Sequence, residues 1–113
     1  MVQNKIVLVH PKNLLGYYNY PNLGLISVGS ALGAAGYSVK IMSQRVSGNK
    51  WKEELNELLK DCLYVGISAL TTEIPAAIEI LKFIKQNSTV PTVMGGWHAT
   101  LLPEQTSASP LVD

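Results

Sequence analysis

The sequence predicts an α/β fold in which helices cover both faces of a parallel sheet. Short β-branched apolar runs alternate along the chain with segments of helical periodicity, in the order strand, helix, strand, helix, strand, helix, strand. Parallel strands need crossover connections, and helices usually provide them, so this alternation favours a parallel sheet. With 113 residues, of which 47% are hydrophobic and 15% charged, the chain is long enough for one domain only. We expect the strand order 2-1-3-4, with a fifth strand begun near the C-terminus.

The first half of the chain supplies two strands and a helix. Residues Lys5–Val9 form a β-branched run that ends at His10-Pro11, which is typical of a strand buried on both faces. Asn22 is placed to cap a helix over Leu23–Ala35, and Gly36 stands where a left-handed residue ends such a helix. Residues Tyr37–Met42 then form the second strand. The predicted helix contains three glycines: Gly24, Gly29 and Gly33. Each lowers helix stability by roughly 1 kcal/mol relative to alanine, and close packing on the sheet or a ligand must offset this loss.

The second half repeats the pattern. A helix from near Asn49 has one apolar stripe, made of Trp51, Leu55, Leu58, Leu59 and Cys62. Leu63–Ala69 is the third strand. Thr71 and Thr72 can cap the next helix, which ends at Asn87. Thr92–Met94 is the fourth strand. The final residues 110–113 begin a fifth strand that is not completed. Residues 1–113 are therefore expected to form a single domain that is truncated at its C-terminal end.

Charge and cysteine content exclude several functions. A net charge of +1 without a cluster of Lys or Arg gives no basic surface for nucleic acid or an anionic membrane. The single cysteine, Cys62, excludes an internal disulfide and any cysteine-based metal site within these residues. The N-terminus shows neither a signal peptide nor a membrane span. We expect a cytoplasmic protein without nucleic-acid or membrane partners.

The predicted topology brings three loops together at the carboxyl ends of the strands, where ligands of open α/β sheets bind. These loops contain His10-Pro11, Ser68–Thr71 and Gly95–His98. A dinucleotide site needs Gly-x-Gly-x-x-Gly after the first strand, and no pair of glycines here has the first spacing. A phosphoacceptor receiver domain needs an Asp at the end of the third strand, where this chain has Ser68. Both of these interpretations therefore fail.

Several motifs resemble cobalamin-binding domains, which share the flavodoxin-like (Rossmann-like) three-layer arrangement. Ser68-Ala69-Leu70 and Gly95-Gly96 look like the Ser-x-Leu and Gly-Gly elements of those domains. The resemblance is greatest to the N-terminal domain of cobalamin-dependent radical SAM enzymes and covers nearly the whole chain. Its motifs are the segments 21–25, 36–39, 65–68 and 95–104, the last being the most specific: Gly95-Gly96-Trp97-His98-Ala99-Thr100-Leu101-Leu102-Pro103-Glu104.

The resemblance implies that cobalamin is the cofactor. It implies that Ser68 offers its hydroxyl to the base of the nucleotide tail and that Gly95 and Gly96 leave room for the tail. The full set of expected cofactor-binding residues is Ser68, Ala69, Leu70, Thr71, Gly95, Gly96, Trp97, His98, Tyr20 and Gly24. No catalytic residue and no metal ligand are expected within the chain. His98 could approach the cobalt, but a histidine after a glycine turn more often bonds the local backbone.

Two departures from the family pattern limit what is carried over. The Asp-x-His-x-x-Gly element of classical cobalamin domains is missing, since Asn13 follows His10 by three residues, so we expect base-off binding without a histidine ligand. Ser43-Gln44 stands where family members often have a carboxylate. The Cys-x-x-x-Cys-x-x-Cys motif is also absent, so S-adenosylmethionine and the [4Fe-4S] cluster would belong to a downstream domain of a parent enzyme, of methyltransferase or cyclase type. This chain alone is not expected to be catalytic.

Two other functions remain open from the sequence alone. A flavodoxin-like domain could bind a nucleotide or a flavin in the same crevice, although the loop 10–14 lacks the Ser, Thr and Gly density that binds phosphate. A ligand-free interaction domain could keep the same fold. Whatever the ligand, an incomplete fifth strand would leave the fourth strand, Thr92–Met94, with an unpaired edge, and we expect self-association through it.

Overall fold

The computed structural model describes residues 4–13, 23–95 and 104. Four strands alternate with helices along the chain, as the sequence predicts. The elements are β1 (Lys5–His10), α1 (Leu23–Ala34), β2 (Ser38–Ser43), α2 (Gln44–Ser47), the 3₁₀ turn η1 (Gly48–Lys50), α3 (Trp51–Leu58), β3 (Cys62–Ser68), the 3₁₀ turn η2 (Thr71–Glu73), α4 (Ile74–Asn87) and β4 (Thr92–Gly95).

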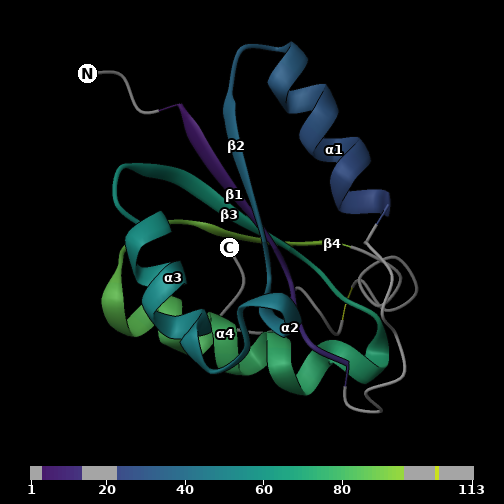
Figure 1. The fold of residues 1–113 in the computed structure, drawn as a ribbon, viewed down its shortest axis with the longest axis vertical. Coiled ribbons are helices and arrows are strands. Elements are labelled where there is room, and N and C mark those ends of the chain that lie inside the picture. The colour runs from purple at the N-terminus through teal and green to yellow at the C-terminus, as the bar shows by residue number, and fades with distance from the viewer. Residues whose placement is uncertain (1–3, 14–22, 96–103, 105–113) are drawn as a thin grey trace.

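The strands form one parallel sheet in the order β2-β1-β3-β4, which confirms the predicted fold class and strand order. Helix α1 lies on one face of the sheet, and α2, α3 and α4 lie on the other (Figure 1). The fifth strand expected at residues 110–113 lies outside the described residues.

The larger part of the core lies between the sheet and helices α3 and α4. It joins alternate residues of the central strands, such as Val7, Val9 and Val65, to Leu55 of α3 and Ile80 of α4, all fully buried or nearly so. Burial of such side chains is the main favourable term in folding, at about 25 cal/mol per Å² of apolar surface. The four inner residues of β1 are all buried, as expected for a strand covered on both faces.

The second face has a smaller core under α1. Its buried members are Ile6, Leu8 and Leu25. The backbone of α1 approaches the sheet at Gly29, where a Cβ atom would lie 3.3 Å from Ile41 Cδ1 and 3.6 Å from Leu8 Cδ1. Close packing therefore explains one of the three helical glycines, while a Cβ on Gly33 would meet nothing within 4 Å among the described residues.

The end of α1 confirms the predicted glycine stop. Gly36 has a φ of +98°, its N–H donates to the Gly33 carbonyl, and the N–H of Tyr37 donates to the Leu32 carbonyl. These two bonds form a Schellman motif, which satisfies the last carbonyls of the helix.

Two local expectations were wrong in detail. Cys62 is a buried core residue, as expected, but it begins β3 instead of ending the preceding helix. The segment Thr71–Glu73 is a 3₁₀ turn, and the Thr72 hydroxyl accepts a hydrogen bond from Asn13 Nδ2 at 2.8 Å instead of capping α4. The Thr72 hydroxyl, which the local pattern predicts to cap α4, therefore binds a residue far away in the sequence.

Candidate functional site

Ser68 and Gly95 lie side by side at the carboxyl edge of the sheet. They end β3 and β4 respectively and are register partners in the parallel ladder. The N–H of Ala69 donates to the Gly95 carbonyl at 3.2 Å, which ties the turn after β3 to the end of β4. Ser68 is half-buried, and its hydroxyl makes no hydrogen bond to any described residue. The two sequence motifs predicted to share one site are thus in direct contact.

Space is open in front of Gly95. A Cβ atom built on it meets nothing within 4 Å among the described residues. The alternation of strands places Gly95, Val93 and Ser68 on the sheet face that α1 covers, but α1 packs over β1 and β2. Accordingly Val93 is 48% exposed. Among the described residues, no helix covers this half of the face beside Ser68.

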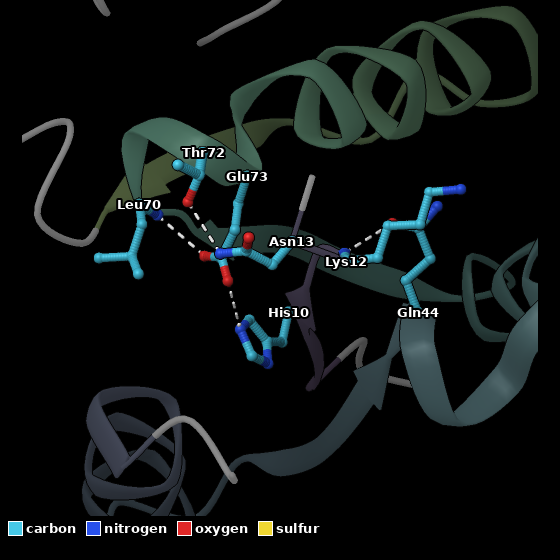
Figure 2. Close-up of polar contacts among 7 residues, drawn as sticks. All are labelled: His10, Lys12, Asn13, Gln44, Leu70, Thr72 and Glu73. Atoms are coloured by element: carbon cyan, nitrogen blue, oxygen red, sulfur yellow. Dashed lines mark hydrogen bonds and ion pairs between the residues drawn. The ribbon is translucent and has the colours of Figure 1, made fainter. Parts of the chain in front are cut away.

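The turn after β3 is held by a pair of reciprocal hydrogen bonds. The N–H of Leu70 donates to Glu73 Oε1 at 2.9 Å (Figure 2). In return, the N–H of Glu73 donates to the Leu70 carbonyl at 2.8 Å. The first bond is the one that a capping-box Glu makes to the backbone three residues before it. The backbone that follows Ser68 is therefore fixed by a side chain.

Glu73 is a buried carboxylate with polar partners on several sides. It is 2% exposed, and its Oε2 lies 3.1 Å from His10 Nε2 at the end of β1 (Figure 2). Burial opposes the charged form, but hydrogen bonds from His10, the Leu70 amide and Asn13 together outweigh it and hold the pKa of Glu73 below its usual range. The carboxylate only accepts, so His10 Nε2 is the donor.

One further polar contact at the same edge joins the segment after β1 to the start of α2, which follows β2. The N–H of Lys12 donates to Gln44 Oε1 at 2.9 Å (Figure 2). Because a backbone N–H can only donate, this contact fixes which end of the Gln44 amide is oxygen. Gln44 is 2% exposed, and its Nε2 has no hydrogen-bond partner among the described residues.

The structure describes six of the ten predicted site residues. Ser68, Gly95 and the half-buried Leu70 lie together at the carboxyl edge. The side chain of Ala69 is in the core, so only its backbone faces the site, and Gly24 is exposed in the first turn of α1. Thr71 begins η2. Tyr20, Gly96, Trp97 and His98 lie outside the described residues.

The sequence analysis placed His10 and Gln44 at strand ends on this edge but did not predict their side-chain contacts, and it missed Glu73 altogether. The signal for Glu73 was present, since a Glu three residues after the first residue of a turn is the capping-box spacing. Its contact with His10 joins residues 63 positions apart, and local pattern does not predict such a contact.

Two classes of feature are absent from the part of the chain that the structure describes. No group of three His, Cys, Asp or Glu side chains there could hold a metal ion. No helix there has the length and apolar character needed to cross a membrane.

Comparison with known proteins identifies similar domains. The family model that matches is that of the B12 binding domain, over residues 15–113. Two similar solved structures are of the radical S-adenosylmethionine methyltransferase TsrM from Kitasatospora setae, one with tryptophan substrate and the SAM analogue aza-SAM bound, the other with cobalamin and a [4Fe-4S] cluster bound. Their identities to this chain are 20% and 19%, with TM-scores of 0.76 and 0.77 over 88% and 89% of it. The chain covers 20% of the length of each, and at this identity the likeness concerns the fold. No curated protein matches the chain.

Proposed function

Because this chain belongs to the family of B12-binding domains, we propose that it holds cobalamin at the carboxyl edge of the sheet, with the nucleotide tail of the cofactor beside Ser68 and Gly95. The observation that supports this assignment is that, among the described residues, nothing lies within 4 Å of a Cβ atom on Gly95, which stands next to the half-buried Ser68. Cobalamin, when bound, supplies a cobalt centre for methyl-transfer or radical chemistry.

The residues present fit such a cofactor. The Ser68 hydroxyl is in place to hydrogen-bond the tail base, and Gly95, which no packing requirement explains within the described residues, leaves room for the tail. The Leu70 and Thr71 backbone follows directly after Ser68 and would border the same space. We assign the remaining contacts to Tyr20, Gly24, Gly96, Trp97 and His98 as the family motif implies.

We further propose that cobalamin binds base-off, without a protein imidazole on cobalt. The chain lacks the Asp-x-His-x-x-Gly element, and the nearest described histidine, His10, donates through Nε2 to Glu73. Electron paramagnetic resonance of the cob(II)alamin form tests this through nitrogen superhyperfine splitting. A single-nitrogen pattern from the protein would contradict the proposal.

The larger protein that this domain would serve is, in our proposal, a radical SAM enzyme. Likeness in fold to TsrM and the motif segments 21–25, 36–39, 65–68 and 95–104 support this. With one cysteine, the chain has no cluster-binding motif of its own, so S-adenosylmethionine and the iron–sulfur cluster would belong to another domain.

The binding experiment uses the purified chain and hydroxocobalamin. After incubation and desalting, we expect the protein fraction to keep the corrinoid absorption band. A parallel sample with flavin mononucleotide tests the flavodoxin-like alternative, and retention of flavin instead of the corrinoid would overturn the assignment. Retention of neither would favour the ligand-free interaction domain.

We also propose that the chain self-associates through β4. Among the described residues β4 pairs with β3 alone, so within this part of the chain its other edge has no strand partner. Open strand edges seek partners. Light scattering at high concentration should show dimers or larger species, whereas a clean monomer would contradict this.

A further inference from the structure

Glu73 is the charged group nearest in sequence to the proposed tail site, and it is almost fully buried. Burying a carboxylate is unfavourable unless hydrogen bonds replace its water. Replacing a buried ion pair by apolar groups of the same volume is often neutral or stabilising, so stability alone does not explain an acid at this position.

The hydrogen bonds of Glu73 determine where the turn after Ser68 lies. Its Oε1 accepts from the Leu70 amide, while the neighbouring Ala69 amide donates to Gly95. Two consecutive amides of one turn are thus held from opposite sides, one by β4 and one by the Glu73 side chain. His10 and Asn13, both from the exit of β1, hold the carboxylate in turn.

We propose that Glu73 is a positioning residue of the cobalamin site: its carboxylate oxygen holds the Leu70 amide and so fixes the turn after Ser68, whose backbone borders the space proposed for the nucleotide tail. This inference rests on the proposed function and adds to it a residue that never touches the cofactor. The competing explanation is a helix cap that stabilises the start of α4 and nothing else.

Two uncharged variants of nearly equal size separate these explanations. Glu73→Gln keeps a carbonyl oxygen that can accept from the Leu70 amide, whereas Glu73→Met fills the same volume without an acceptor. We expect hydroxocobalamin affinity within about threefold of wild type for Glu73→Gln. We expect a loss of about tenfold or more for Glu73→Met, because hydrogen bonds to charged groups are among the stronger ones. A helix cap alone predicts lower stability for Glu73→Met but unchanged hydroxocobalamin affinity in the folded variant, whereas a positioning role predicts that affinity falls for Glu73→Met and is kept by Glu73→Gln.

The matched control is Glu57→Met. Glu57 also pairs with a basic side chain, Lys60 at 3.0 Å, but both groups are largely exposed and neither belongs to the proposed site. Cobalamin affinity should equal that of wild type. Equal affinity of Glu73→Met and wild type, both folded by circular dichroism, would overturn the inference and leave the proposed function intact. Loss of cobalamin binding by wild type itself would overturn both.

If Glu73→Met does not fold, the wild-type chain still provides a test. In a ¹H–¹⁵N correlation spectrum, titration with diamagnetic hydroxocobalamin should shift the Leu70 amide signal, and Glu73→Gln should show a similar shift. A Leu70 amide that stays unchanged while cobalamin binds would overturn the inference.

Discussion

Gly95→Val should remove cobalamin binding without weakening the fold. Gly95 ends β4 next to Ser68, and a Cβ atom there meets nothing within 4 Å among the described residues. Its backbone lies outside the left-handed region, so a side chain introduces no strain. The added isopropyl group would point into the space that we assign to the nucleotide tail.

The two expected effects have opposite signs. Glycine within a strand costs roughly 0.5–1 kcal/mol relative to alanine, and valine suits strands still better, so the free energy of unfolding should stay equal or rise by up to about 1 kcal/mol. Filling the tail space should lower affinity by at least about a hundredfold, which corresponds to about 2.8 kcal/mol.

Urea unfolding followed by circular dichroism measures the first effect, and absorbance titration with hydroxocobalamin measures the second. Gly33→Ala is the control, since it also adds a side chain to open space but in α1. Wild-type affinity in Gly95→Val would refute the placement of the tail. A loss of stability above about 2 kcal/mol would refute the conclusion that Gly95 is free of packing.

Three further predictions follow from the same structure. Ser68→Ala should weaken cobalamin binding by about 0.5–1.5 kcal/mol in calorimetry, the net value of one hydrogen bond, and an unchanged affinity would contradict the role of the hydroxyl. The folded pKa of Glu73 is below its ordinary 4.5, so its charged form stabilises the fold at higher pH. The stability difference between wild type and Glu73→Gln should therefore be complete at neutral pH and shrink as the pH falls below about 4.5, and a difference independent of pH would refute this. Gly33→Ala should raise the free energy of unfolding by about 0.5–1 kcal/mol. Gly29→Ala should raise it by less, because a Cβ atom on residue 29 would meet β2 side chains at 3.3 and 3.4 Å. Equal increases for the two variants in chemical denaturation would contradict this packing.

The fold was largely predictable because its strands are short apolar runs with clear ends. β1, β2, β3 and β4 each begin and end within one residue of the predicted positions, since β-branched residues and the Gly and Pro that flank them act locally. The start of α4 was less predictable. There Asn13, far away in sequence, binds Thr72, and this contact competes with the local capping preference.

The site was predictable only where topology places it. The alternation of elements predicts parallel strands, and the resemblance to flavodoxin-like cobalamin domains implies the order 2-1-3-4. In that order Ser68 and Gly95 end neighbouring strands and therefore meet. The contacts of His10 with Glu73 and of Lys12 with Gln44 span 63 and 32 positions and depend on side-chain geometry. Composition and periodicity carry no information on such pairs.

The central position of β1 has a consequence for how the chain folds. The first strand pairs with β2 on one side and β3 on the other, and its last residue bonds to Glu73. The β1-α1-β2 unit has only the small core of Ile6, Leu8 and Leu25. The main core also needs residues of β3 and α4. Pairing of β1 with β3 closes a long loop, and the chain loses entropy in that step before the contacts of the core can form. The folding rate should therefore depend on the β1–β3 pairing. During synthesis on the ribosome, the first half of the chain should therefore have no stable structure until the second half has been made.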